Sequence, residues 1–158
     1  MNNFSNQYSI IKNIGKGSFG SVYKIKRYSD DNTYALKKIL LSANKDQYSL
    51  NCLLNEVKIL TGHDSNYLLR CYNVYVSDGY LNIVTDYAKY CDLKEYIKIY
   101  KNKNKKMAEY LIWDIFIQCC LGLDYLHKYN IIHRDIKTAN ILVDSHHRIW
   151  LGDFGISK

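Results

Sequence analysis

The chain has 158 residues, 47% hydrophobic and 23% charged, and its 22 Lys and Arg residues outnumber its 15 Asp and Glu residues to give a formal net charge of +7. This composition is typical of a folded globular domain and excludes a disordered chain. The sequence has no apolar run long enough for a transmembrane helix and no secretory signal at its start. Five scattered cysteines without a C-x-x-C pair favour reduced thiols, so the cytoplasm is the expected compartment and the nucleus the alternative.

The first half of the chain is rich in predicted β-strands. Strands are expected over residues 8–15, 21–27 and 33–40, separated by a glycine-rich turn and by the polar turn "SDDN". Between Gln47 and Leu60, apolar residues recur at three- and four-residue spacing, which predicts an amphipathic helix. Two more apolar runs, 68–77 and 80–87, flank Asp78-Gly79, a dipeptide typical of hairpin turns.

The second half is predicted to be mainly helical. Asp92 is a candidate N-cap for a helix that starts at Leu93, and a long helix is expected from Ala108 to Lys128. That helix is apolar nearly all round, so we expect neighbours on every side, and in their absence partly exposed side chains at Trp113, Ile117 and Leu121. The lysine-rich segment 98–107 is interpreted as a solvated loop rather than a nucleic-acid site. "ILV" and "RIWLGD" are short strands or loops, and "SHH" between them is interpreted as a hairpin turn rather than a zinc site.

The segment "GKGSFGSV" has the pattern G-x-G-x-x-G-x-V between two predicted strands. Glycines let backbone N–H groups approach phosphate oxygens closely, although a glycine-rich turn alone is the simpler alternative. The segment is not a dinucleotide-binding fingerprint, because that motif would lead from a strand into a helix. It is not a Walker A loop either, because that loop needs the spacing G-x-x-x-x-G-K-S/T.

Two charged residues follow on the expected third strand and helix. Lys37 in "YALKK" needs an anionic partner if it is buried, and Glu56 in "LLNEVKIL" could supply it. The alternative is that both are ordinary exposed charges.

The segment "HRDIKTAN" followed by "GDFG" resembles the catalytic loop and metal-binding motif of the eukaryotic protein kinases. The glycine-rich loop, Lys37 and Glu56 stand in that family's order, so the resemblance covers the chain from Ile14 to Gly155. Within the family the segments are most similar to the NIMA-related serine/threonine kinases. The resemblance implies an α+β, bilobal kinase fold with a five-stranded N-lobe sheet and one helix (8–86), a hinge (87–91) and a partial helical C-lobe (92–158). A chain that ends just after "DFG" is expected to be a truncated kinase domain, inactive by itself.

The resemblance also implies roles for the polar residues. Asp135 would orient the substrate hydroxyl and accept its proton, and Lys137 would stabilise charge on the transferring phosphoryl group. Lys37 would hold the α- and β-phosphates of ATP and would itself be positioned by Glu56. Mg²⁺ would be bound by Asp153 and Asn140, whose oxygens suit this hard cation.

The ATP-binding positions implied by the resemblance comprise a loop over the phosphates, two apolar surfaces around the adenine, the hinge and a ribose contact. They are Ile14, Gly15, Gly17, Phe19, Gly20, Val22, Ala35, Lys37, Thr85, Asp86, Ala88, Asp92 and Leu142. For Thr85 and Asp92 the alternatives are a strand-end threonine and a helix N-cap.

In the complete domain, the expected function is transfer of the ATP γ-phosphate to Ser or Thr of a protein substrate, with ATP and Mg²⁺ as cofactors and with neither nucleic acid nor membrane as a partner. Lys137, two residues after Asp135, is typical of serine/threonine kinases rather than tyrosine kinases. The alternative is a non-catalytic, pseudokinase-like module that binds ATP or acts as a scaffold.

Overall fold

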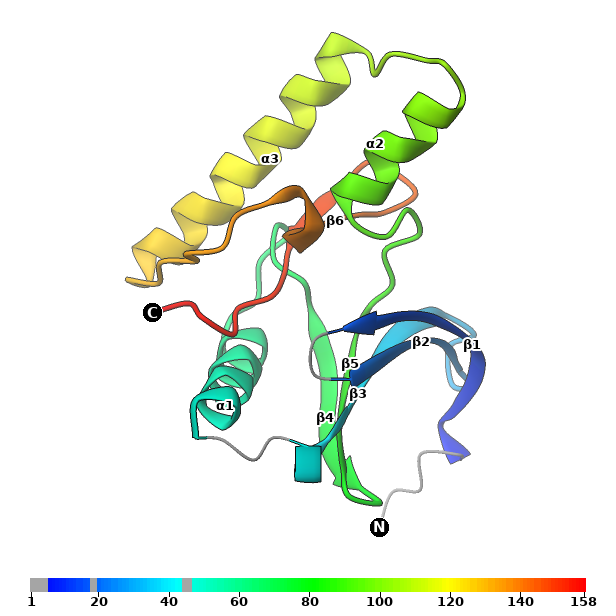
Figure 1. The fold of residues 1–158 in the computed structure, drawn as a ribbon, viewed down its shortest axis with the longest axis vertical. Coiled ribbons are helices and arrows are strands. Elements are labelled where there is room, and N and C mark those ends of the chain that lie inside the picture. Colours follow the sequence, from blue (N-terminus) through cyan, green and yellow to red (C-terminus); the bar gives the residue numbers. More distant parts are fainter. Residues whose placement is uncertain (1–5, 18–19, 44–46) are drawn as a thin grey trace. The chain divides into compact units, whose positions relative to one another are not determined.

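The computed structural model describes residues 6–17, 20–43 and 47–158. The chain divides into two compact units: unit 1 comprises residues 1–50 and 71–87, and unit 2 comprises residues 51–70 and 88–158. Unit 1 is built around a β-sheet and unit 2 is mainly helical (Figure 1). The predicted α+β fold, a five-stranded sheet with one helix followed by further helices, is therefore confirmed. No helix in the described part of the chain is both long and apolar enough to cross a bilayer.

The sheet of unit 1 is antiparallel throughout, with the strand order β1-β2-β3-β5-β4. Its strands are β1 (Tyr8–Gly17), β2 (Gly20–Arg27), β3 (Thr33–Leu40), β4 (Cys71–Ser77) and β5 (Tyr80–Asp86), and a short 3-10 helix, η2 (Leu41–Ala43), follows β3. One face of the sheet carries an apolar core to which aromatic and aliphatic side chains from four strands contribute. Its buried members are Tyr8, Ile25, Tyr34, Leu36 and Val84, with Tyr23 and Tyr75 packed against them.

The hairpin between β4 and β5 forms at the predicted dipeptide. Asp78 and Gly79 both have positive φ, 52° and 77°, the combination that a two-residue hairpin turn of type I′ requires. Strand β4 starts at Cys71, three residues later than the apolar run suggested. The reason is that the residues before Cys71 pair within unit 2 and not with the sheet of unit 1. Leu68 forms a parallel bridge with Leu151, and the Leu69 N–H donates to the Leu151 carbonyl at 3.0 Å.

Gly20 lies where β2 approaches the β3 backbone very closely. A Cβ atom at this position would lie 2.1 Å from the carbonyl oxygen of Lys38, whereas a Cβ at Gly15 would meet nothing within 4 Å. The clash at position 20 is between a Cβ, whose place is fixed by the β2 backbone, and a backbone carbonyl of β3, so no side-chain rotation can relieve it. The sequence at position 20 is therefore restricted to glycine by packing.

Replacing Gly20 with Ala is expected to lower the free energy of unfolding by about 1–3 kcal/mol, the usual cost of overpacking. Gly15→Ala is the matched control, since it adds the same methyl group to the neighbouring strand without a clash. Urea denaturation of both variants measures the difference. Equal midpoints for the two variants would show that the close approach of β2 to β3 is wrong.

Unit 2 holds most of α1 (Gln47–Gly62), together with the remaining helices and a small two-stranded sheet. The other elements are α2 (Leu93–Asn102), α3 (Glu109–Lys128), a 3-10 helix η3 (Thr138–Asn140), and the antiparallel pair β6 (Ile141–Val143) and β7 (Ile149–Leu151). Asp92 caps α2 as predicted, because its side chain accepts a hydrogen bond from the Glu95 N–H at 2.8 Å.

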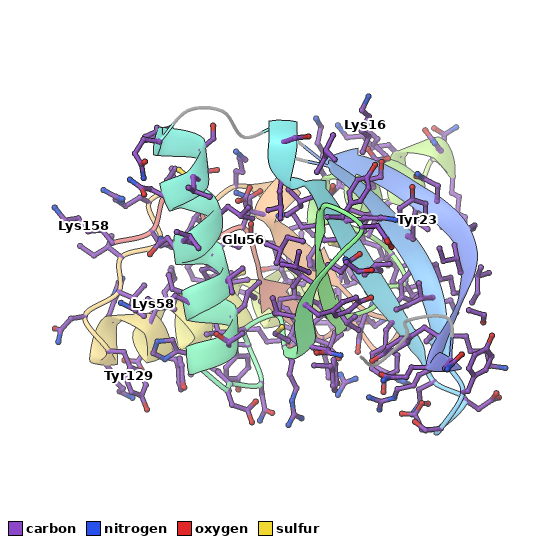
Figure 2. All side chains as sticks on the ribbon, turned by 90° about the horizontal axis from the view of Figure 1, so that it is seen from below. Lys16, Tyr23, Glu56, Lys58, Tyr129 and Lys158 are labelled. Carbon is purple, nitrogen blue, oxygen red and sulfur yellow. The ribbon has the colours of Figure 1, made fainter. Side chains whose placement is uncertain are left out.

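Helix α3 packs against β7 through one face only. Leu111, Ile115 and Leu126 are buried. On another part of the helix Trp113 and Ile117 are 55% and 52% exposed, which confirms the predicted exposure of this apolar helix. Helix α1 is likewise two-sided: Glu56 is buried while Lys58 is exposed, and the two side chains leave the helix in different directions (Figure 2).

Candidate active site

Three of the predicted catalytic and metal-binding side chains form one hydrogen-bonded cluster in unit 2. The Asp135 carboxylate oxygen Oδ2 accepts from Lys137 Nζ at 2.6 Å and from Asn140 Nδ2 at 2.9 Å. Asn140 Nδ2 also donates to the Asp135 carbonyl at 2.9 Å. The segment between Asp135 and Asn140 is thus closed into a compact loop by its own polar side chains.

The loop that carries Asp153 lies beside this cluster. The Gly152 N–H donates to the Asn140 carbonyl at 3.0 Å, which joins the two loops just before Asp153. His133 is buried, and its Nε2 lies 3.0 Å from the Gly152 carbonyl. Since a carbonyl only accepts, Nε2 carries the hydrogen of this bond, and Nδ1 can accept from the Asp135 N–H at 3.4 Å.

Both loops contain backbone in a conformation that side chains rarely adopt. Arg134 and Asp153 have φ values of 63° and 61°. Such outliers cluster at functional sites, where surrounding contacts hold them in place. Here the contacts are evident: Phe154 is fully buried and packs on the His133 ring at 5.2 Å between centroids, while the Asp153 side chain is exposed.

The electrostatics of the cluster favour charged side chains at neutral pH. The hydrogen bond from Lys137 holds the pKa of Asp135 below its usual value, and Asp135 in turn raises the pKa of Lys137. Burial lowers the pKa of His133, which favours the neutral ring that its hydrogen bonds require. Asp135 is therefore an ionised carboxylate that can accept a proton.

Unit 1 places several predicted ATP-binding residues on one face of its sheet. Val22 lies opposite Lys37 in the β2–β3 ladder, and Ala35 lies opposite Thr85 in the β3–β5 ladder. Directly opposed residues share a face, and so do residues two apart on one strand. These four side chains therefore point to the face opposite the apolar core that contains Leu36.

The glycine-rich segment forms the hairpin that joins β1 and β2. Gly15 pairs with Val22, and Gly17 pairs with Gly20. Ile14 lies within β1. Phe19, predicted for the tip of the loop, lies outside the described residues.

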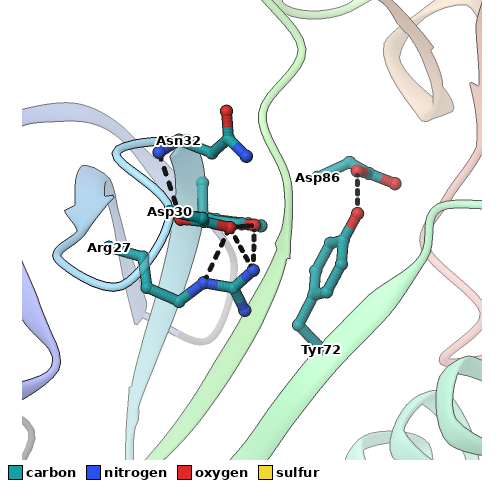
Figure 3. A network of polar contacts seen from close by, with 6 residues as sticks. Arg27, Asp30, Asn32, Tyr72 and Asp86 are labelled. Atoms are coloured by element: carbon teal, nitrogen blue, oxygen red, sulfur yellow. Dashed lines mark hydrogen bonds and ion pairs between the residues drawn. The ribbon is translucent and has the colours of Figure 1, made fainter.

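The end of β5, where the hinge is predicted, is anchored by a side chain that the sequence did not reveal. Tyr72 on β4 donates its hydroxyl hydrogen to Asp86 Oδ1 at 2.9 Å (Figure 3). The Tyr72 ring packs edge-on against the Tyr34 ring, with 4.8 Å between their centroids.

On the neighbouring strands Arg27 pairs with Asp30, which also accepts from the Tyr34 hydroxyl at 2.7 Å and from the Asn32 N–H at 3.1 Å (Figure 3). The hydrogen bond from Arg27 lowers the pKa of Asp30. This network links β2, β3 and the turn between them close to Tyr72.

The remaining predicted site residues lie in unit 2. Leu142 is on β6 and forms an antiparallel bridge with Asp92. Ala88 is the first residue of the segment 88–158, the longer of the two segments of unit 2. Glu56 is buried on α1. Lys37 belongs to unit 1 and Glu56 to unit 2, and their pairing stays a prediction, as do the boundaries 8–86, 87–91 and 92–158.

Asp153 and Asn140 suit a hard divalent cation. Because the Asn140 amide nitrogen is turned towards Asp135, its amide oxygen points away from that carboxylate. A carboxylate and an amide oxygen are donors that Mg²⁺ accepts, and it commonly completes its shell with water and phosphate oxygens. The described residues contain no group of three or more His, Cys, Asp or Glu side chains that could hold a metal ion.

A five-stranded antiparallel sheet with a glycine-rich hairpin, followed by a helical unit with Asp135 and Asp153 on adjoining loops, defines a kinase-type fold. The comparison with protein families agrees: residues 8–158 match the model of the protein kinase domain. The chain belongs to the protein kinase domain family.

Individual relatives support the narrower resemblance as well. The chain is 37% identical over 155 residues to probable serine/threonine-protein kinase nek3 of Dictyostelium discoideum, covering 96% of this chain and 14% of that protein. It is 32% identical to serine/threonine-protein kinase Nek10 of Homo sapiens (96% and 14%) and 33% identical to Nek3 of Mus musculus (96% and 28%). The predicted similarity to NIMA-related kinases is confirmed, and the chain spans less than a third of the length of these three relatives.

Proposed function

We propose that the protein transfers the γ-phosphoryl group of ATP to the hydroxyl of Ser or Thr in a protein substrate. The observation that carries this proposal is the cluster of Asp135, Lys137 and Asn140 beside the loop of Asp153. Phosphoryl transfer depends mainly on positioning and on charge stabilisation, and this cluster offers a carboxylate, an ammonium group and two candidate metal ligands within adjoining loops.

Asp135 acts on the acceptor hydroxyl in this proposal. Its ionised carboxylate orients the hydroxyl and takes up its proton as the oxygen bonds to the γ-phosphorus and the bond from that phosphorus to the β,γ-bridging oxygen breaks. Lys137, now bound to Asp135 Oδ2, supplies positive charge to the phosphoryl group in transfer. Asp153 and Asn140 would hold Mg²⁺, which when bound neutralises charge on the phosphates.

The nucleotide contacts are proposed by the same family resemblance. In unit 1, backbone N–H groups of Gly15, Gly17 and Gly20 hold phosphates, Lys37 holds the α- and β-phosphates, and the side chains of Val22 and Ala35 meet the adenine. Further contacts are assigned to Ile14, Phe19, Thr85, Asp86, Ala88, Asp92 and Leu142, with Glu56 positioning Lys37. Asp92 accepts the capping hydrogen bond from the Glu95 N–H through Oδ1, which leaves Oδ2 for a ribose hydroxyl.

Protein substrates with a Ser or Thr acceptor are proposed because Lys137 is typical of this class and because the relatives are named serine/threonine-protein kinases. A cytoplasmic location is also proposed. The alternative of a non-catalytic module has no supporting observation, since Lys37, Asp135, Asn140 and Asp153 are all present.

The test is transfer of label from γ-³²P-ATP to a mixed Ser, Thr and Tyr peptide by the intact protein, followed by identification of the labelled amino acid. We expect phosphoserine and phosphothreonine, abolished in Lys37→Met. Lys38→Met is the matched control, because the next residue on β3 faces the other side of the sheet and lies over the Tyr80 ring at 4.4 Å. Dominant phosphotyrosine would overturn the substrate class, and label that survives in Lys37→Met would overturn the site.

A further inference from the structure

Asn55 on α1 contacts the backbone of the metal-binding loop directly. Its side-chain Nδ2 donates to the Phe154 carbonyl at 2.9 Å and to the Ser157 carbonyl at 2.8 Å. Because both partners are acceptors, the amide nitrogen and not the amide oxygen must face them, and both of its hydrogens are used. One side chain thus bridges two carbonyls that flank Gly155 and Ile156.

The same face of α1 packs against the loop at a second point. Cys52 lies three residues before Asn55, on the same side of the helix, and is buried. A Cβ atom at Gly155 would lie 3.6 Å from the Cys52 Cβ and 3.7 Å from the Cys52 carbonyl oxygen. The helix thus leaves room beside Gly155 for no more than one methyl group, next to the two hydrogen bonds.

The other contacts that hold this loop come from residues 132–133 and from Asn140. Ile132 and Lys158 exchange two backbone hydrogen bonds of 2.7 and 3.0 Å, and the Ser157 hydroxyl donates to the His133 carbonyl at 3.1 Å. Gly152 is held by His133 and Asn140, as described above. Asp153 thus lies between Gly152, fixed by the catalytic loop, and Phe154, fixed by Asn55.

We propose that Asn55 is a positioning residue that connects α1 to the metal-binding loop and fixes the backbone from which the Asp153 carboxylate projects. The inference rests on the proposed function for its metal and deepens it. Asp153 has a φ of 61°, so its backbone depends on neighbouring contacts to stay in this conformation. A shift of α1 that breaks the Asn55 bonds releases one side of that support.

The proposal also gives α1 a second connection to the site. Asn55 directly precedes Glu56, the predicted partner of Lys37. The same turn of α1 therefore carries one residue for the metal loop and one for the phosphate-binding Lys.

Two nearly isosteric variants test the role of the amide. Asn55→Leu removes both donors, and Asn55→Asp places a carboxylate against two carbonyls. Lys58→Gln is the control, because Lys58 is exposed on the same helix and its replacement changes the net charge by the same amount as Asn55→Asp. Circular dichroism and thermal unfolding establish that each variant is folded.

The first measurement is hydrogen exchange of residues 153–158 in the intact protein without ligand. Faster exchange is expected in both Asn55 variants, because the Ser157 N–H donates to the Phe154 carbonyl that Asn55 also holds, and unchanged exchange is expected in Lys58→Gln. Exchange equal to the parent in both Asn55 variants would overturn the inference.

The second measurement is the gain in affinity for the ATP analogue AMPPNP when Mn²⁺ is added, compared with the affinity for adenosine. The gain should fall about tenfold in both Asn55 variants, the factor that corresponds to one ordinary hydrogen bond, with adenosine binding unchanged. An unchanged gain despite faster exchange would overturn the positioning role and leave Asn55 a structural contact. If Mn²⁺ does not raise the affinity of the parent protein for AMPPNP, the proposed function and the metal role of Asn55 are both contradicted. The exchange measurement still decides, in that case, whether Asn55 fixes this backbone.

Discussion

Replacing Asp135 with Asn lowers the turnover of phosphate transfer by about 10²- to 10⁴-fold, the range over which a general base contributes. The amide keeps the shape of the carboxylate but cannot take up the proton of the acceptor hydroxyl. Mg·ATP should still bind, because the nucleotide and the metal are assigned to other residues. A large loss in kcat with little change in the ATP KM is therefore the expected signature.

Steady-state kinetics with varied ATP measure this effect. Asp124→Asn is the control, since Asp124 is an exposed residue on α3 that pairs with Lys128 at 2.6 Å. If Asp135→Asn retained most of the parent turnover, Asp135 would not be the group that receives the proton.

Replacing Asp153 with Ala abolishes the gain in ATP affinity that Mg²⁺ gives. The triphosphate carries adjacent negative charges that need a cation between them, and this substitution removes the carboxylate assigned to that cation. Adenosine has no phosphates, so its dissociation constant should stay within about twofold of the parent, the scale of an ordinary surface substitution.

Calorimetric titrations of ATP and of adenosine, each with and without Mg²⁺, measure both quantities. Asp124→Ala is the control, because it also removes an exposed carboxylate from unit 2. Should Asp153→Ala bind Mg·ATP as tightly as the parent, the metal assignment would be refuted.

Most elements of the fold could be predicted from the sequence because their signals are local. The hairpin at Asp78-Gly79 follows from residues that tolerate positive φ, and α2 starts after Asp92 because that side chain can cap it. Helix α3 begins within one residue of its predicted start.

The differences arise where a distant contact decides. Strand β4 begins at Cys71 and not at Leu68, because Leu68 pairs with Leu151 instead. An apolar run shows that a segment is buried and does not show which partner buries it.

In the candidate site, too, the residues with a local sequence pattern could be predicted and those held by distant contacts could not. Asp135, Lys137 and Asn140 lie within one short segment with a recognisable pattern, and the structure brings their side chains together. Asn55 was not predicted, because a hydrogen bond to Phe154 across 99 residues leaves no local pattern. Its only sequence signal was its place directly before Glu56, and the bond of Tyr72 to Asp86 had no signal at all.

We propose that Asp153 and Asn140, beside Asp135, hold the metal that accompanies ATP. The most direct measurement is anomalous X-ray diffraction from crystals of the protein grown with Mn²⁺ and AMPPNP. We predict a Mn²⁺ peak at a coordination distance of about 2.1 Å from an Asp153 carboxylate oxygen, with the Asn140 amide oxygen as a ligand of a metal ion at the same phosphates. Bound nucleotide with its Mn²⁺ peaks away from both residues would contradict the account.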